Sequence, residues 1–257
     1  NCIGTINLLE SLKTLQSECA VVLITTDKVY RNIEEKYSYK EEDILGGQDP
    51  YSSSKACMEM LVSSWRESFC GFKKNQTKKL SIATARAGNV IGGGDFASYR
   101  LIPDVFRAIS NNEKVSIRNP FSTRPWQHVL DPLNGYLLLA ESLFDKLKQE
   151  SKPINTFSRA FNFGPKTNSN KTVNEVLNEI KKHWNFEFDI SNNADNFHES
   201  KLLNIDSSLA YNLLNWQPIW PFELTLEKTI KWYKNFIEGY DSGRLCEEDI
   251  NQFFYYS

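Results

Sequence analysis

The sequence has 257 residues, of which 40% are hydrophobic and 24% are charged, which is the composition of an ordinary globular protein. The formal net charge of −2 creates no field that favours nucleic acid or an anionic membrane surface. No apolar run approaches the roughly 20 residues that span a bilayer. The five cysteines are scattered, without a CxxC pair or a Cys/His cluster. This pattern indicates reduced thiols in a cytoplasmic protein rather than a disulfide framework or a metal site.

The chain opens on Asn1 inside a helical pattern, in which apolar residues from Ile3 to Leu15 recur on one face. No basic segment followed by an apolar stretch precedes this pattern, so the start is not a signal peptide. A helix without a lead-in indicates a fragment of a longer protein. Residues 20–25 then form a short β-branched run, which is typical of a strand buried on both faces of a parallel sheet.

After a polar stretch, Pro50 stands where the N-terminus of a helix accepts it, with Asp49 as the cap. Residues 51–69 show helical spacing, and residues 80–85 form a second buried-strand pattern that leads into a glycine-rich loop over 88–94. This alternation of helix and strand predicts an α/β fold with a doubly wound parallel sheet.

The regular alternation of predicted helices and strands changes beyond about residue 96, and we expect two lobes. The first covers residues 1–98 and receives a strand near 160–164, and the second covers mainly 99–257. Within the second half we predict helices over 101–110, 133–147, 173–184 and 224–237, a short strand over 115–118, and surface loops over 166–170 and 191–196.

Tyr51 and Lys55 stand four positions apart on a predicted helix, so their side chains leave the same face. A lysine ammonium beside a phenol favours the phenolate, which would make Tyr51 a base near neutral pH. Alone, this spacing describes many solvated helices. Its position, on a helix that follows a buried strand and a long loop, favours a catalytic interpretation.

Thr25, Thr26, Asp27 and Lys28 follow the first predicted strand. Ligands of open parallel sheets bind at the carboxyl ends of the strands. A hydroxyl, a carboxylate and an ammonium at this place are suited to proton transfer, although a turn that merely leaves the sheet explains them equally well.

Two further segments have the chemistry of ligand binding. The glycines of residues 88–94 allow a close backbone approach to phosphate, although no P-loop Lys-Ser/Thr follows them and a plain flexible loop is the alternative. Arg118 and Arg124 lie close in sequence to Trp126 and His128, a group that suits a diphosphate beside a base or a sugar. Structural roles for Trp126 and His128 are the competing interpretation.

Taken in order, these segments resemble the extended short-chain dehydrogenase/reductases that act on nucleotide sugars. The resemblance implies a Rossmann-like doubly wound sheet, whose first strands we expect to precede the residues given, and a smaller C-terminal α/β lobe that binds the substrate. The matching motifs are Asn-x-x-Gly-Thr over 1–5, Thr-Thr-Asp-Lys over 25–28, Tyr-x-x-x-Lys over 51–55, Ala-Arg-Ala-Gly-Asn-Val over 85–90, and Leu-Asn-Trp-Gln-Pro over 214–218.

Finer details resemble the subfamily that dehydrates CDP-glucose. Lys28 stands where dTDP-glucose dehydratases typically carry a glutamate, and Asp27 stands where the epimerases of the wider family have a neutral residue. We therefore expect the dehydration of CDP-glucose to CDP-4-keto-6-deoxyglucose. The alternatives are a dehydratase or epimerase for a dTDP-, UDP- or GDP-linked sugar, or a non-catalytic protein that binds nucleotide sugars.

The resemblance implies a mechanism without net redox change. Tyr51, held as the phenolate by Lys55, takes the proton of the sugar 4-hydroxyl while hydride passes from C4 to NAD+, and Thr26 hydrogen-bonds the same hydroxyl. Asp27 protonates the departing 6-hydroxyl as water is lost across C5 and C6, and hydride returns to C6. Lys28 either accepts the C5 proton or stabilises the enolate.

The resemblance also implies the remaining contacts. The glycine fingerprint that seats the NAD pyrophosphate does not occur in the sequence given, so we expect this chain alone to hold NAD poorly. The family commonly forms homodimers through helices that correspond to residues 1–18 and 51–69, and a role in polysaccharide biosynthesis is implied by kinship. The expected NAD contacts are Tyr51, Lys55 and Thr25, and the expected nucleotide-sugar contacts are Asn89, Arg100, Arg118, Arg124 and His128.

Overall fold

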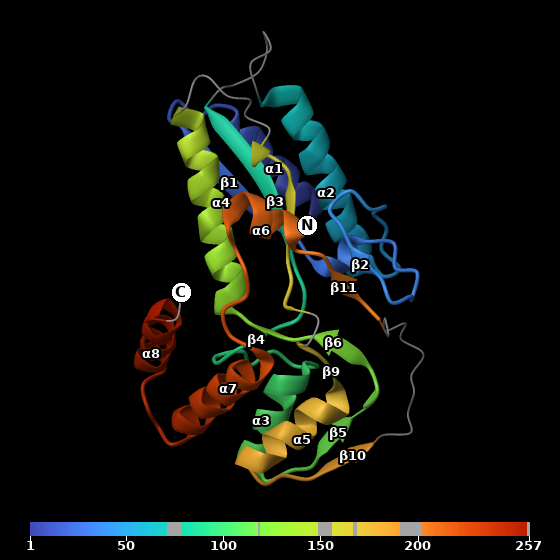
Figure 1. Ribbon diagram of the computed structural model, residues 1–257, viewed down its shortest axis with the longest axis vertical. Coiled ribbons are helices and arrows are strands. Elements are labelled where there is room, and N and C mark those ends of the chain that lie inside the picture. The colour runs from blue at the N-terminus through green and yellow to red at the C-terminus, as the bar shows by residue number, and fades with distance from the viewer. Residues whose placement is uncertain (71–78, 118, 149–155, 167–168, 191–201, 256–257) are drawn as a thin grey trace. The chain divides into compact units, whose positions relative to one another are not determined.

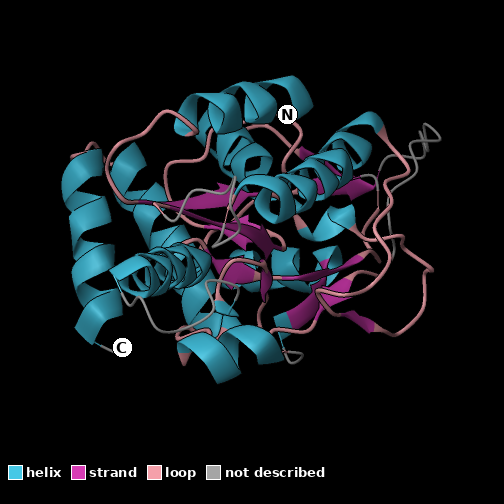
Figure 2. Cartoon of the chain, turned by 90° about the horizontal axis from the view of Figure 1, so that it is seen from above, coloured by secondary structure: helices cyan, strands magenta, loops and turns pink. Residues whose placement is uncertain are grey.

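The computed structural model describes residues 1–70, 79–117, 119–148, 156–166, 169–190 and 202–255. The chain divides into two compact units, each assembled from three stretches of sequence. The first unit contains Asn1–Gly88, Pro132–Gly164 and Leu203–Gln217, and the second contains Asn89–Asp131, Pro165–Leu202 and Pro218–Ser257. Helices and strands alternate along the chain (Figure 1 and Figure 2).

A parallel sheet of three strands lies at the centre of the first unit (Figure 1). Its order is β1 (Cys19–Ile24), β3 (Leu80–Ala87) and β8 (Ala160–Phe163). Residues 80–86 of β3 are all buried, as expected of a central strand that is covered on both faces. Parallel pairing brings the carboxyl ends of the strands to one edge of the sheet, which is where Thr25 follows β1.

Helices cover both faces of this sheet, namely α1 (Cys2–Leu12), α2 (Pro50–Phe69), α4 (Leu130–Lys148) and α6 (Ser208–Leu214). One apolar cluster joins Leu9 of α1 and Val62 of α2 to Ile82 of β3. Another joins Leu139 of α4 to Phe161 of β8. The predicted α/β fold with a doubly wound parallel sheet is therefore confirmed.

The segment between β1 and α2 contains the 3₁₀ turn η1 (Asp27–Val29) and β2 (Ser38–Tyr39), which pairs with β11 (Asn204–Ile205). The helix α2 begins where the sequence predicts. Asp49 accepts the backbone N–H of Tyr51 at 2.8 Å, in a capping box that satisfies N–H groups of the first turn. This cap defines the first turn of α2, from which Tyr51 projects.

Short paired strands replace a continuous sheet in the second unit: β4 (Val90–Ile91) with β7 (Gln127–His128), β5 (Val115–Ile117) with β10 (Phe188–Ile190), and β6 (Thr123–Pro125) with β9 (Asn170–Thr172). Its helices are α3 (Leu101–Asn111), α5 (Val173–His183), α7 (Phe222–Ile237) and α8 (Ser242–Tyr255). The rings of Phe106 and Tyr233 stack with their centroids 4.2 Å apart in its apolar core.

The structure corrects several predictions. The first stretch of the first unit ends at Gly88, whereas we expected this lobe to run to residue 98, and Pro132–Gly164 and Leu203–Gln217 belong to the same unit. The helix α1 ends at Leu12, and Ile3 is 75% exposed. The strand β1 is mostly half-buried, because it pairs on one side only within the described sheet.

Other outcomes concern the second unit. The helix α8 was not predicted from the sequence, and the predicted loop at 166–170 ends in β9. Part of that loop and the predicted loop at 191–196 lie outside the described residues. No helix in the described part of the chain is both long and apolar enough to cross a membrane.

Candidate functional site

The end of β1 carries the first group of predicted site residues. Thr25 and Thr26 are each 7% exposed and Asp27 is 3% exposed, whereas Lys28 is exposed. The Thr26 hydroxyl donates to Asp27 at 3.1 Å and accepts the backbone N–H of Lys28 at 3.3 Å. These bonds define the turn η1, which holds a buried carboxylate beside a buried hydroxyl at the carboxyl edge of the sheet.

Tyr51 and Lys55 project from the same face of α2, as predicted. The Lys55 ammonium donates to the backbone carbonyl of Ile24 at 2.8 Å, which places it at the end of β1, next to Thr25. Tyr51 is 50% exposed, and its hydroxyl has no hydrogen-bond partner among the described residues. The structure therefore brings the Tyr51–Lys55 pair and the strand-end group into one site within the first unit.

Electrostatic interactions connect the same residues. Burial lowers the pKa of Lys55, although the nearby charge of Glu59 opposes this shift. Burial alone would raise the pKa of the Asp49 carboxyl, but hydrogen bonds from the first turn of α2 and the charge of Lys28 outweigh it, so the pKa is lowered. Lys28 therefore lies within electrostatic reach of the N-terminus of α2.

Tyr136 of α4 is a neighbour that sequence reasoning missed. Burial raises the pKa of its phenol, and the negative charge of Asp27 raises it further. Its ring packs edge-on against Phe163 with the centroids 5.4 Å apart. A phenol that stays protonated thus faces the buried carboxylate of the strand-end group.

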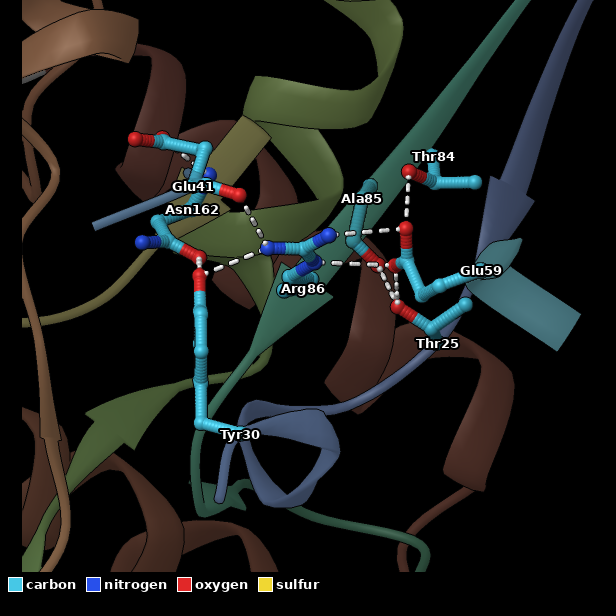
Figure 3. A network of polar contacts seen from close by, with 8 residues as sticks. All are labelled: Thr25, Tyr30, Glu41, Glu59, Thr84, Ala85, Arg86 and Asn162. Carbon is cyan, nitrogen blue, oxygen red and sulfur yellow. Dashed lines mark hydrogen bonds and ion pairs between the residues drawn. The ribbon is translucent and has the colours of Figure 1, made fainter. Parts of the chain in front are cut away.

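Sequence reasoning also missed the buried ion pair between Glu59 and Arg86, which are 2% and 3% exposed. Arg86 belongs to the Ala-Arg-Ala-Gly motif, which we associated with a sugar-nucleotide loop. In the structure its guanidinium turns inward and lies 2.9 Å from Glu59 (Figure 3). The available signal was a pair of opposite charges, one on the apolar stripe of α2 and one in a strand that is otherwise apolar or hydroxyl-bearing.

The predicted nucleotide-sugar contacts belong to the second unit. Asn89 is half-buried, and its carbonyl accepts the backbone N–H of Gln127 at 3.2 Å. Arg124 lies on β6, is 9% exposed and donates to the Thr123 carbonyl at 2.9 Å. Arg100 is exposed at the start of α3. Arg118 lies outside the described residues.

Arg100 also makes an exposed ion pair with Asp95 at 3.4 Å. An exposed pair of this kind contributes little to stability, because solvent screens it and two long side chains lose freedom. The Arg100 guanidinium is therefore available to an anionic ligand at small cost.

His128 and Trp126 are interior residues of this unit. His128 is 2% exposed, and its Nδ1 accepts the backbone N–H of Leu130 at the start of α4, at 3.3 Å. Its Nε2 has no hydrogen-bond partner among the described residues. The Trp126 indole donates to the Lys171 carbonyl at 3.0 Å, which supports the structural interpretation of this tryptophan.

The glycine run serves close packing. A Cβ atom on Gly93 would lie 2.0 Å from the Trp232 ring, and one on Gly92 would lie 2.9 Å from Val129. Gly94 has a φ of +81°, which side chains disfavour. Glycine is thus required at 92–94 by neighbouring side chains and backbone conformation, a cause that the sequence did not reveal.

A parallel α/β sheet with Thr-Asp-Lys directly after its strand β1 and Tyr-x-x-x-Lys in the first turns of α2 defines an enzyme of the nucleotide-sugar dehydratase class. Residues 1–229 match the family model described as GDP-mannose 4,6 dehydratase, and the chain belongs to this family. It is similar to CDP-glucose 4,6-dehydratase of Salmonella typhimurium, with 40% identity over 254 residues that cover 98% of this chain and 69% of the relative. Human dTDP-D-glucose 4,6-dehydratase is 24% identical over 239 residues, which cover 90% of this chain and 60% of that protein.

Solved structures agree on the fold. A dTDP-glucose 4,6-dehydratase from Bacillus anthracis in complex with NAD matches with a TM-score of 0.70 and 21% identity, covering 93% of this chain and 68% of that one. MoeE5 in complex with UDP-glucose and NAD matches with a TM-score of 0.74 and 20% identity, covering 91% of this chain and 71% of that one. The expected Rossmann-like fold and the resemblance to extended short-chain dehydrogenase/reductases are confirmed.

His128 generates a prediction for pH dependence. Burial, aided by the positive charge of Lys228, lowers the pKa of His128 to about 3. The unfolded chain binds this proton at about pH 6.5, so the contribution of His128 to stability is complete above that pH. It is lost as the pH falls toward 3, by up to about 1.4 kcal/mol per pH unit. Unfolding by denaturant between pH 7 and pH 5 measures this slope.

His128→Gln removes the titrating group, so its free energy of unfolding should depend less steeply on pH than that of the wild type. Ring ¹⁵N NMR provides the direct check, because Nδ1 should remain an unprotonated acceptor across this range. A protonation midpoint of the His128 ring near pH 6 would contradict the prediction.

Proposed function

We propose that the protein is an NAD-dependent dehydratase that converts CDP-glucose to CDP-4-keto-6-deoxyglucose. The observation that carries the proposal is the Lys55–Ile24 hydrogen bond of 2.8 Å, which places the Tyr51–Lys55 pair at the end of the strand that bears Thr26 and Asp27. The 40% identity to a CDP-glucose 4,6-dehydratase supports the choice of substrate.

NAD would supply a hydride acceptor at C4 and return the hydride at C6. The residues present fit the nicotinamide end of this cofactor. Lys55 uses one of its three donors on the Ile24 carbonyl, and Tyr51 offers a hydroxyl that has no partner among the described residues. This donor set suits the ribose hydroxyls beside the nicotinamide. The Thr25 hydroxyl donates into the interior, so a contact of Thr25 with NAD would use other atoms.

Tyr51 is the proposed base. It accepts the proton of the sugar 4-hydroxyl, and the ammonium of Lys55 stands four positions further on the same face of α2. The Thr26 hydroxyl, which donates to Asp27 in this structure, turns to donate to the same oxygen. The half-exposed ring of Tyr51 and the fixed position of Lys55 suit this role, because a base must reach the proton that it removes.

Asp27 is the proposed acid that protonates the departing 6-hydroxyl. It is 3% exposed and lies one residue after Thr26, at the carboxyl edge of the sheet. The protonated Tyr136 nearby adds no charge of its own. Lys28 is exposed at the same turn and acts on the C5 proton, either as the base or as a cation that stabilises the enolate.

The second unit binds the nucleotide sugar in this proposal. Arg124 and Asn89 contact the diphosphate, and Arg100 and Arg118 add positive charge. Bidentate hydrogen bonding makes arginine the preferred partner of diphosphate oxygens. His128, which is buried and caps α4, acts by supporting this region rather than by donating to the ligand from the surface.

Turnover by the full-length protein with NAD+ tests the proposal. We expect CDP-glucose to yield a 4-keto-6-deoxy product, measured by its absorbance in alkali, and dTDP-, UDP- and GDP-linked sugars to yield little. Turnover of another nucleotide sugar instead of CDP-glucose would keep the chemistry and overturn the substrate. An epimerised product would overturn dehydration, and no turnover of any of them would favour a binding protein.

Tyr51→Phe separates an enzyme from a binding protein. The substitution removes the proton acceptor and leaves the aromatic ring, so kcat should fall by at least about a hundredfold, as for loss of a general base. Binding of CDP-glucose, measured by calorimetry, should change little. Full activity of this variant would contradict the mechanism. Tyr211→Phe, at an exposed tyrosine of α6, is the matched control.

We also propose that the protein is a cytoplasmic homodimer that pairs through α1 and α2. All five cysteines are free thiols, in keeping with a reducing compartment. Ile3 and Leu8 of α1 and Met60 of α2 are 75%, 44% and 55% exposed, and these helices pack against each other. Exposed apolar side chains on adjacent helices are typical of an interface between subunits.

Sedimentation of the full-length protein tests the dimer. We expect a dimeric mass for the wild type and a monomeric mass for Ile3→Lys/Met60→Lys, because two charges per subunit would be buried in the interface. Ile44→Lys, at a loop residue that is 71% exposed, is the control and should remain dimeric. A monomeric wild type, or a double variant that still dimerises, would refute this interface.

A further inference from the structure

A network of buried and half-buried polar residues lies directly beside the proposed active site in the first unit (Figure 3). It joins β1, α2, β3, β8 and the segment after η1, and none of its charged members was predicted as part of a network. Its members are Thr25, Tyr30, Glu41, Glu59, Thr84, Arg86 and Asn162.

Glu59 is the centre of this network. Arg86 donates to its two carboxylate oxygens from Nε and Nη2, both at 2.9 Å, in a bidentate pair. The Thr84 hydroxyl donates to Oε2 at 2.7 Å, and the Thr25 hydroxyl donates to Oε1 at 2.5 Å. Glu59 is therefore held by four hydrogen bonds, three from β3 and one from the residue that follows β1.

Arg86 is fixed on its other side. Its Nη1 donates to the Tyr30 hydroxyl at 2.8 Å and to the Glu41 carbonyl at 3.1 Å. The Tyr30 hydroxyl donates in turn to the Asn162 side chain at 2.7 Å. The guanidinium thus has one orientation, because partners at fixed positions occupy both of its ends.

Glu59 connects this network to the proposed catalytic residues on two sides. On α2 it stands four positions after Lys55 and eight after Tyr51, so the three side chains leave the same side of the helix. At the strand end it accepts the hydroxyl of Thr25, which immediately precedes Thr26. The bond from Lys55 to the Ile24 carbonyl is a second attachment between the same two elements.

We propose that Glu59 is a positioning residue for the dehydratase reaction. Clamped by Arg86, it anchors Thr25 and so holds the strand end that carries Thr26 and Asp27 at a fixed distance from Tyr51 and Lys55. This role rests on the proposed function above. A base and an acid that act on one sugar ring need such fixed spacing, because small displacements of catalytic groups cost large factors in rate.

The charges around Glu59 show that it also affects the protonation of Lys55. Three cations lie near it: Lys55 and Arg66 from α2 and Arg86 from β3. The carboxylate of Glu41 and the phenol of Tyr30 face Arg86 from the segment after η1. Glu59 therefore balances a local excess of positive charge, and its loss would make the protonated form of Lys55 less stable.

Ionised Glu59 is consistent with this arrangement. Burial alone would raise its pKa, but the hydrogen bonds and charge of Arg86, with the hydroxyls of Thr25 and Thr84, outweigh burial, and the pKa is lowered. Glu59 thus keeps its charge at neutral pH, where it supports the protonated ammonium of Lys55.

Three substitutions in the full-length protein with NAD+ test the proposal. Thr25→Val removes the anchoring hydroxyl at nearly constant volume, so kcat should fall about tenfold or more while KM for CDP-glucose stays within about twofold. Thr25→Ser restores the hydroxyl and should recover most of kcat. Ser81→Ala is the control, because it breaks a part-buried hydroxyl pair of 2.7 Å between β3 and Ser158 and should lower stability without this loss of kcat.

Glu59→Gln provides a measurement that a merely structural role would not affect. With the carboxylate removed, Lys55 loses its proton more easily, so the alkaline limb of kcat/KM should move to lower pH by about one unit. The same limb should stay in place in Ser81→Ala.

The outcomes separate this proposal from the proposed function. Wild-type turnover of any nucleotide sugar, together with unchanged kcat in Thr25→Val or an unmoved alkaline limb in Glu59→Gln, would overturn the positioning role alone. If Glu59→Gln does not fold, the kcat of Thr25→Val against that of Thr25→Ser decides the matter. No turnover by the wild type with any nucleotide sugar would overturn both proposals.

Discussion

The buried guanidinium of Arg86 sets the constraint on which the first unit depends. A cation in an apolar interior is unstable unless a carboxylate and further acceptors surround it, and removing one partner of such a pair costs roughly 3–5 kcal/mol. Glu59, Tyr30 and the Glu41 carbonyl provide these acceptors. Because they come from α2 and from the segment after β1, satisfying one side chain of β3 brings these elements to defined positions at the carboxyl edge of the sheet.

The apolar clusters of the same unit stabilise the fold but do not fix the exact positions of its elements. Leu9, Val62 and Ile82 on one face of the sheet and Leu139 and Phe161 on the other belong to the apolar clusters whose burial drives folding. Apolar contact has no direction, so it permits small sliding of a helix over a sheet. The hydrogen bonds of Glu59 do not permit it, and the two kinds of interaction together give both stability and a defined site.

Sequence periodicity predicted most of the first unit for a clear reason. The run at 20–25 is short, β-branched and apolar, the run at 80–85 is short with apolar and hydroxyl-bearing residues, and the start of α2 combines Asp49 with Pro50, so local chemistry indicates these elements. Tyr51 and Lys55 could be paired from their spacing, because helix geometry relates positions four apart. The Lys55 bond to Ile24 could not be predicted in this way, because it depends on how α2 packs against β1.

The sequence predicted a residue's role less well where that role depends on a partner that is far away in the chain. The need for glycine at Gly93 comes from Trp232, and the inward turn of Arg86 comes from Glu59. Neither partner is near in sequence, and a glycine loop or an arginine after a strand has a ready interpretation as a ligand contact. His128 is similar, since its capping bond to Leu130 is local but its burial is not.

The return of β8 to the sheet has a consequence for how the protein is made. The bond between Tyr30 and Asn162 joins residues that are 132 positions apart, and the second unit is encoded within that interval and beyond it. A ribosome therefore releases β1, α2 and β3 long before β8, the strand that pairs with β3. During that time the carboxyl end of β3 lacks its neighbour, and the Tyr30 hydroxyl lacks its acceptor on Asn162. Long-range pairing of this kind slows folding and exposes strand edges, so the nascent chain is expected to depend on protection by chaperones until residue 217 has emerged.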